Sequence, residues 1–122
     1  MVKCRIVDVK DGTFVDASGK AGTNPNWHYL KIECDVGKAY SSVYHEPTSG
    51  YCEIENFSTE PMSEGIGRVA LPLVEKHLRD WGCKKADIQI VEGTGGFWKK
   101  MGYREYPDQD LGLVYQRAYK RL

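Results

Sequence analysis

The pattern of hydrophobic and polar residues changes near Pro61, and the two parts of the chain predict different elements. Before it, short runs rich in β-branched and aromatic residues predict strands at residues 4–9, 13–15, 27–36, 38–46 and 51–57. Asp11 and Gly12 predict a hairpin turn between the first two runs, and Gly37 predicts a second turn between the next two. Residues 16–26 are rich in Gly, Ser and Asn and predict a loop.

Strong helical periodicity begins after Pro61. Apolar residues recur three and four positions apart at Ile66, Val69, Ala70, Leu73, Val74, Leu78 and Trp81, and Gly82 follows as a helix stop. The remaining sequence predicts a strand at 86–91, a short helix at 94–101 and strands at 103–106 and 113–119. A strand, a long helix and a strand in succession predict one parallel crossover in an otherwise antiparallel sheet.

Length and composition limit the classes of protein to consider. The chain has 122 residues, which predicts one domain spanning residues 1–122. Hydrophobic residues make up 41%, so a disordered chain is excluded, and 17 basic against 17 acidic residues give no global attraction to nucleic acid or to an anionic membrane. No apolar run approaches the roughly 20 residues of a membrane span, and the first residues do not resemble a signal peptide. We therefore expect a cytoplasmic protein with neither nucleic acid nor membrane as a partner.

Four cysteines, Cys4, Cys34, Cys52 and Cys83, carry no CxxC spacing. Without a signal peptide they are expected to be reduced thiols, although an even number leaves disulfides open. No His, Cys or carboxylate residues follow one another at the spacing of a metal site, so no metal is predicted.

Two local features carry candidate chemistry. Residues 61–67, PMSEGIG, lie between a predicted strand and the long helix, where the amides of a helix N-terminus form a ready site for phosphate. A tight turn between strand and helix explains the glycines as well. Alternation along the strand 51–57 predicts one face with Cys52, Ile54 and Asn56 and the other with Glu53, Glu55 and Phe57. The two glutamates form either a general base or a solvated surface.

Roughly residues 50–104 resemble the GNAT N-acetyltransferase superfamily in two motifs. The strand, Gly65-Ile66-Gly67 and the helix resemble the acetyl-CoA-binding motif R/Q-x-x-G-x-G/A, and residues 96–103, GFWKKMGY, resemble A-x-x-F-Y-x-K-x-G-F. The resemblance implies an α+β fold. Its GNAT-like layout would be a mixed, largely antiparallel twisted sheet of about seven strands with two helices, splayed between strands 4 and 5.

The resemblance also implies a function. Acetyl-CoA would be the co-substrate of an acyltransferase, and a primary amine such as a protein lysine or N-terminus would attack it directly. Glu53 or Glu55 would be the catalytic base. A homodimer stays open for this chain. The residues expected to bind the cofactor are Phe57, Met62, Ser63, Glu64, Gly65, Ile66, Gly67, Arg68, Phe97, Trp98 and Lys100.

The chain departs from the family at the positions that carry chemistry. Met62 replaces the usual Arg or Gln, and Glu64 puts a negative charge in the phosphate loop, where Arg68, Lys99 and Lys100 are expected to compensate. Trp98 stands where a tyrosine acts as the acid, and an indole N–H cannot donate a proton near neutral pH. On the short helix, Phe97 and Met101 are expected to face the sheet. Trp98 is expected either to form a hydrophobic wall at the cofactor edge or to belong to the core. Tyr51 and Tyr103 are possible substitutes for the acid.

A further departure concerns the acceptor side. The family places two helices between its first two strands, where this chain has the loop 16–26. Three alternatives would explain the missing helices: an open cleft that fits a macromolecular amine, a partner subunit that supplies the wall, or no acceptor at all. His28 and His45 are candidates for a base or for acceptor contacts, or else surface residues. The alternatives to an enzyme are a catalytically silent CoA-binding or protein-interaction regulator and a structural module whose strand gap is filled by side chains.

Overall fold

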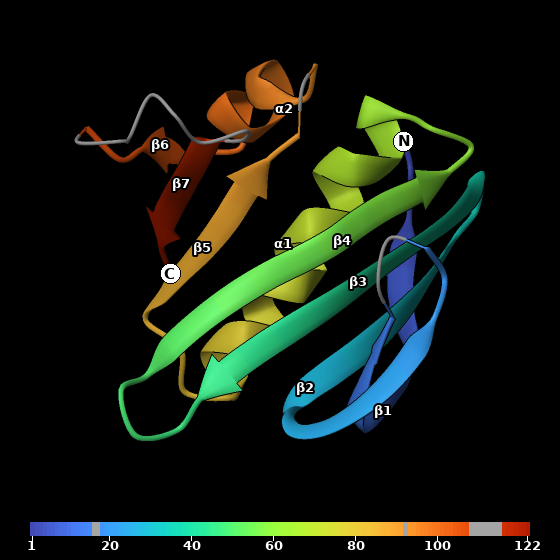
Figure 1. The fold of residues 1–122 in the computed structure, drawn as a ribbon. Helices are drawn as coiled ribbons and strands as arrows, with labels where there is room; N and C mark the ends of the chain where they lie inside the picture. Colours follow the sequence, from blue (N-terminus) through green and yellow to red (C-terminus); the bar gives the residue numbers. More distant parts are fainter. Residues whose placement is uncertain (16–17, 92, 108–115) are drawn as a thin grey trace.

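A computed structural model describes residues 1–15, 18–91, 93–107 and 116–122. Within them, seven strands form one mixed sheet in the order β1-β2-β3-β4-β5-β7-β6 (Figure 1). The strands are β1 (Cys4–Val15), β2 (Ala21–Cys34), β3 (Gly37–Glu46), β4 (Tyr51–Glu60), β5 (Lys85–Ile90), β6 (Arg104–Glu105) and β7 (Gln116–Arg121), and the helices are α1 (Glu64–Asp80) and α2 (Gly95–Lys100). Neighbouring strands are antiparallel except β4 and β5, so the single parallel crossover through α1 is confirmed.

The predicted fold class is wrong. We expected an α+β domain with the GNAT-like layout, whereas 53% of the described residues lie in strands and 21% in helices. The part of the chain that the structure describes is mostly sheet with two helices, which is not that layout. The reason lies before Pro61, where four strands of 10 to 14 residues follow one another and contribute no helix among the described residues.

The first strands differ from the prediction. β1 runs through the expected turn, because Gly12, with a φ of 75°, lies in a register irregularity between Asp11 and Thr13 instead of a two-residue turn. β2 begins at Ala21, so the predicted loop 16–26 is largely strand, and residues 16–17 lie outside the described residues. The last predicted strand begins at residue 113. Residues 113–115 also lie outside the described residues, and β7 begins at Gln116.

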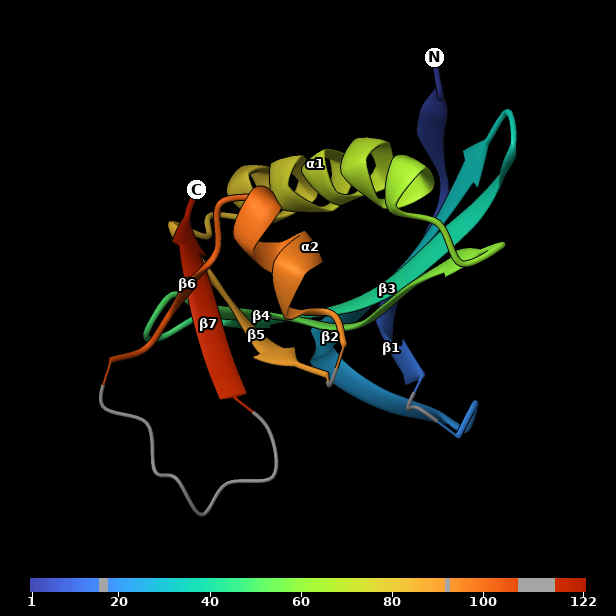
Figure 2. The ribbon, with the colours of Figure 1, turned by 90° about the horizontal axis from the view of Figure 1, so that it is seen from above.

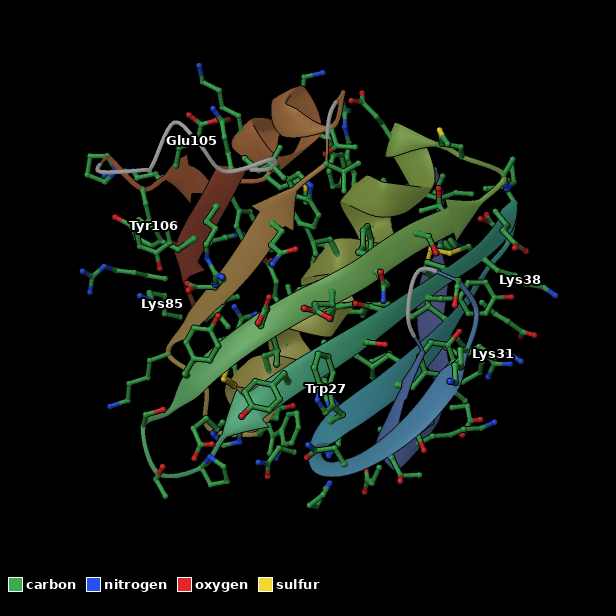
Figure 3. All side chains as sticks on the ribbon, viewed as in Figure 1. Trp27, Lys31, Lys38, Lys85, Glu105 and Tyr106 are labelled. Atoms are coloured by element: carbon green, nitrogen blue, oxygen red, sulfur yellow. A yellow bond between two sulfur atoms is a disulfide. The ribbon has the colours of Figure 1, made fainter. Side chains whose placement is uncertain are left out.

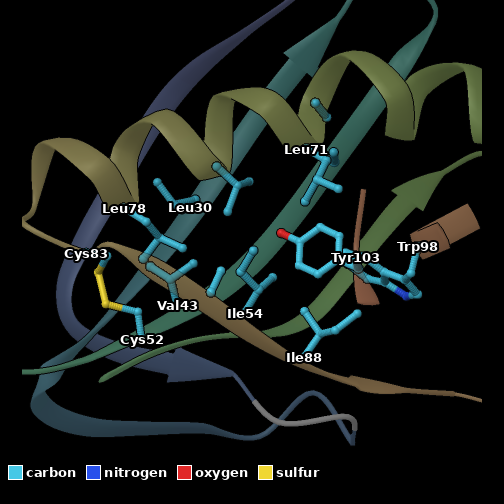
Figure 4. Packing of buried hydrophobic residues seen from close by; sticks show 14 of the residues in the cluster. Leu30, Val43, Cys52, Ile54, Leu71, Leu78, Cys83, Ile88, Trp98 and Tyr103 are labelled. Carbon is cyan, nitrogen blue, oxygen red and sulfur yellow. A yellow bond between two sulfur atoms is a disulfide. The ribbon is translucent and has the colours of Figure 1, made fainter. Parts of the chain in front are cut away.

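Both helices cover one face of the sheet (Figure 2). Ser63 caps α1 through a hydrogen bond from the Ile66 amide to its Oγ, and Gly82 follows the helix. The core lies between α1 and the sheet (Figure 4), with fully buried side chains that include Leu30, Ile32, Val43, Ile88, Leu71, Val74 and Leu78. The other face carries polar and aromatic side chains, among them Trp27, Lys31 and Lys85 (Figure 3).

The cysteines are paired, which contradicts the expected reduced thiols. One disulfide joins Cys4 to Cys34 across β1 and β2, and the other joins Cys52 in β4 to Cys83 after α1. Disulfides persist mainly in oxidising compartments. The cytoplasmic location therefore stays a prediction that this pairing does not favour.

The two edges of the sheet differ in length. β1 has 12 residues, two register irregularities, at Ile6/Asp8 and Asp11/Thr13, and exposed charged side chains. β6, at the other edge, has two residues. Among the described residues, no helix is long and apolar enough to cross a membrane.

Candidate active site

Two adjoining hollows follow β4 from the start of α1 to the point where β4 and β5 separate. The first, of about 300 Å³, is lined by Phe57, Ser58, Thr59, Met62, Ser63, Glu64, Gly67, Gly93, Thr94, Phe97 and Trp98. The second, of about 280 Å³, is lined by Ile54, Glu55, Asn56, Phe57, Gln89, Val91, Thr94 and Trp98. Because the two share Phe57, Thr94 and Trp98, they form one depression, which we call the β4 groove.

A bulge in β4 shapes this groove. β4 pairs with β5 only from Cys52 to Ile54, and Asn56 then takes a φ of 52° opposite an irregularity in β3. One extra residue turns every following side chain to the other face. Phe57 therefore packs against the core, whereas strict alternation had placed it beside the glutamates. The predicted faces of Asn56 and Phe57 are wrong.

At the start of α1, three amide donors already have partners. The Ser63 amide donates to Thr59 Oγ1 at 2.9 Å, the Ile66 amide to Ser63 Oγ at 3.3 Å and the Gly67 amide to the Ser63 carbonyl at 3.1 Å. The amides of Glu64 and Gly65 lie in the first turn of α1, where the helix has no carbonyl one turn earlier to accept from them. A phosphate at this end of the groove would meet those two donors.

The two glycines of this segment differ in their surroundings. A Cβ at Gly67 would lie 2.9 Å from Phe97 Cε1 and Cζ, so Gly67 allows α1 to pack against that ring. A Cβ at Gly65 would meet Ser63 Oγ at an ordinary 3.5 Å. Packing therefore explains Gly67, and it leaves Gly65 unexplained.

Glu53 and Glu55 lie on the sheet face opposite the helices, because Cys52 and Ile54 between them are buried in the core. Burial raises the pKa of the Glu55 carboxyl to about 7, and the neighbouring Glu53 carboxylate adds to the rise. A carboxyl with such a pKa is partly ionised at neutral pH and can accept a proton there. Of the two candidates, only Glu55 is among the residues that line the β4 groove in the described structure.

A network around Glu53 was not predicted. The Tyr51 hydroxyl donates to Glu53 Oε2 at 3.2 Å and accepts from Arg117 Nη2 at 2.6 Å, and burial raises the pKa of Tyr51 to about 12. Arg117 also lies 3.4 Å from Asp87 Oδ2. Arg117 comes from β7 and Asp87 from β5, and no spacing in the sequence indicates that these residues meet β4.

Trp98 is the buried residue of α2, with 8% of its surface exposed. Its ring makes edge contacts with Phe57, Phe97 and Tyr103. Phe97 and Met101 pack against the core as expected but stay partly buried, and Trp98 is the more deeply buried side chain. Trp98 lines both parts of the groove and also belongs to the core.

Tyr103 is not positioned as an acid for this groove. Its hydroxyl donates to Glu75 Oε2 at 2.8 Å, and Lys120 Nζ donates to the other oxygen of that carboxylate at 3.1 Å. Burial raises the pKa of Tyr103 far above its usual value. Tyr103 therefore holds α1 against the C-terminal strands.

At the mouth of the groove, Lys100 Nζ lies 3.5 Å from Glu64 Oε2. The pair joins the end of α2 to the start of α1, and both side chains are exposed. Of the three predicted compensating cations, Lys100 is the one that contacts the Glu64 carboxylate in the part of the chain that the structure describes. Met62, at the position of the family's Arg or Gln, lines the groove and is exposed.

The three histidines gather around Trp81, away from the residues that line the groove. His28 stacks on the Trp81 ring with centroids 3.5 Å apart, and its Nδ1 lies 2.9 Å from His77 Nε2. His45 meets the same indole edge-on at 4.9 Å. Neither His28 nor His45 lines the β4 groove in the described structure. No metal was predicted, yet His45, Cys52 and Cys83 bring three donor atoms within 4.8 Å of one another.

No protein-family model matches the sequence, and a search of curated proteins finds no match. Membership of the GNAT superfamily therefore stays a prediction from its two motifs. The geometry of the β4 groove carries the functional argument.

Proposed function

We propose that the protein transfers an acetyl group from acetyl-CoA to a primary amine. The observation that carries this proposal is the β4 groove, which runs from the first amides of α1 to Glu55, a carboxyl with a pKa of about 7. A candidate phosphate site and a base joined by one partly apolar groove suit a long ligand with a charged end and a reactive end.

The phosphate end of the ligand would lie at the start of α1. The amides of Glu64 and Gly65 point out of the helix, and the partial positive charge of the helix dipole favours an anion there. Lys100 is within reach of the same place, since it contacts Glu64. Phe57, Phe97 and Trp98 then provide apolar walls for an uncharged arm.

The reacting end would lie between β4 and β5. There the groove is lined by Trp98 from the helix side and by Glu55 from the opposite face, so an amine can approach from the face that carries no described helix. Acetyl-CoA would supply the acetyl group as a thioester. Glu55, as carboxylate, accepts a proton from the attacking amine directly or through one water, which leaves the nitrogen lone pair free to form the C–N bond.

The described residues around the groove offer no clear acid for the sulfur. Trp98 cannot donate a proton, and the Tyr103 hydroxyl is bonded to Glu75. A thiol has a pKa of about 8.5, so it can leave as thiolate when the C–S bond breaks and take its proton from water. The missing acid also favours the second candidate function, a catalytically silent protein that binds CoA as a regulator.

Calorimetric titration with acetyl-CoA and with desulfo-CoA tests the shared part of both candidates. Both ligands should bind, and Gly65→Glu should abolish binding by placing a carboxylate at the phosphate end. Gly65→Ala is the matched control and should bind normally. Absence of binding at millimolar ligand would overturn both candidates.

Release of free thiol from acetyl-CoA, measured with polyamines and lysine-rich peptides, separates the enzyme from the regulator. Glu55→Gln should slow release by about 100-fold if Glu55 is the base, without loss of acetyl-CoA binding. Glu53→Gln is the matched control on the same strand face. Binding without thiol release from any amine would favour the regulator.

A further inference from the structure

A second group of reactive side chains lies at the corner where the β3–β4 hairpin meets the segment after α1. His45 is the register partner of Cys52 in the β3–β4 pair. Cys83 follows α1, and its amide donates to the carbonyl of Leu78 in the last turn of that helix at 2.9 Å. Cys52 is 1% exposed and Cys83 is 4% exposed. Figure 4 shows the disulfide between them at the end of the core, below Leu78. We call these three residues the His45 corner.

The imidazole of His45 carries an unexplained polar atom. Its Nδ1 is buried and has no hydrogen-bond partner within the described structure. Leaving such a buried atom unpaired is unfavourable, so it calls for a physical reason. A ring nitrogen of His45 lies within 4.8 Å of both cysteine sulfurs, and the ring is held edge-on against Trp81.

We propose that reduction of the Cys52–Cys83 disulfide turns the His45 corner into a zinc site, with the His45 imidazole and the two thiolates as ligands. Two thiolates and an imidazole are the donor types that Zn²⁺ prefers. Zinc binds sulfur at about 2.3 Å and nitrogen at about 2.0 Å, which requires the donors to lie roughly 3.3–3.8 Å apart. The present spacing needs only small movements once the S–S bond is open. Water would complete the tetrahedron.

The chemistry balances with a dithiol as reductant. The dithiol gives two electrons and two protons to the S–S bond and becomes a disulfide, while Cys52 and Cys83 become thiols. Zn²⁺ then displaces both protons and binds two thiolates. The disulfide and the metal exclude each other, so oxidation of the corner releases the ion.

The other disulfide supplies an internal control. No group of three donors is found around Cys4 and Cys34 in the described part of the chain. A chain with Cys4→Ser and Cys34→Ser keeps the His45 corner, and a chain with Cys52→Ser and Cys83→Ser removes it. The inference stands apart from the proposed acetyl transfer, because none of its three ligands lines the β4 groove in the described structure.

The test is a titration with Co²⁺, a coloured substitute for zinc, on protein reduced with a dithiol and freed from it by gel filtration without oxygen. The Cys4→Ser/Cys34→Ser chain should bind about one equivalent, with thiolate-to-cobalt charge transfer in the near ultraviolet and visible bands of a tetrahedral ion. Zn²⁺ should displace the colour. The oxidised chain and the Cys52→Ser/Cys83→Ser chain should show neither band.

His45→Gln separates a three-ligand site from binding by the thiols alone, and it should weaken Co²⁺ binding by at least about tenfold. Circular dichroism follows the fold of each reduced chain. If reduction unfolds the Cys4→Ser/Cys34→Ser chain, Zn²⁺ should restore its spectrum, because metal binding and folding are then coupled. Unchanged affinity in His45→Gln, or no charge-transfer band in the Cys4→Ser/Cys34→Ser chain, overturns the proposal.

Discussion

Separate replacement of Gly65 and Gly67 by alanine tests whether the two glycines at the start of α1 have different roles. A Cβ at Gly67 would lie 2.9 Å from two atoms of the Phe97 ring, closer than side chains normally pack, whereas at Gly65 the nearest atom is 3.5 Å away. Helix propensity favours alanine over glycine by up to about 1 kcal/mol at both positions. Overpacking a tight contact costs about 1–3 kcal/mol. We therefore expect Gly65→Ala to raise the free energy of unfolding by about 0.5–1 kcal/mol and Gly67→Ala to lower it by about 0.5–2 kcal/mol.

Urea unfolding of the oxidised protein measures both values. A double variant, Gly67→Ala with Phe97→Leu, gives the control, because a smaller side chain at 97 should recover part of the loss and show coupling between the two sites. Acetyl-CoA binding should weaken in Gly67→Ala, where Phe97 must move, and stay unchanged in Gly65→Ala. Equal shifts of the same sign in both alanine variants would refute the explanation of Gly67 by packing.

Three further predictions concern charge and hydrogen bonding. Because the folded state raises the pKa of Glu55 from 4.5 to about 7, it holds that proton more tightly, and wild-type stability should fall as pH rises through this range. Glu55→Gln should lessen that fall in thermal melts at pH 4.5 and 8, and an unchanged pH dependence would contradict the shift. Glu64→Gln should strengthen acetyl-CoA binding about fivefold, since about 1 kcal/mol of repulsion is removed, and weaker binding in calorimetry would assign Glu64 a supporting role. Tyr103→Phe removes the donor to Glu75 and should cost about 1–3 kcal/mol in urea unfolding without slowing thiol release per folded molecule, so a clear loss of turnover would identify Tyr103 as an acid.

The sequence predicts α1 well and its buried face less well. Periodicity and the glycine stop place the helix within a few residues of its observed ends, at Glu64–Asp80. The pattern expected Val69 and Leu73 in the buried stripe, whereas the structure buries Leu71 and Glu75. Glu75 is buried because two partners, from segments far along the chain, hydrogen-bond its carboxylate. Periodicity on one helix carries no information about such partners.

The sheet shows a similar limit. Alternation places Glu53 and Glu55 on a common face, as they are in the structure, but it fails beyond the bulge at Asn56. Gly12 predicts a turn from the sequence but lies in a bulge, because a positive φ serves a bulge and a turn equally. The disulfide pairing could not be derived either, since four cysteines allow three pairings and spacing does not choose among them.

The candidate site required contacts between distant segments. Sequence motifs indicated the α1 end of the groove and the two glutamates, which lie close together in the chain. Arg117, from β7, reaches Tyr51 beside Glu53, and Trp98 faces the core more than the cofactor edge. Both results depend on how β5, β7 and α2 meet β4, which is decided by packing and strand pairing.

The irregular first strand has a consequence for self-association. A long, straight edge strand exposes backbone donors and acceptors that invite another chain to extend the sheet, as in the early steps of aggregation. On β1, two register irregularities and exposed charges such as Arg5, Asp8 and Lys10 oppose such pairing, although Val7 and Val9 are exposed there. β6 offers only two residues at the opposite edge. Growth by edge-to-edge stacking is therefore disfavoured at both ends, and a homodimer, if one forms, would have to meet through the faces of the molecule.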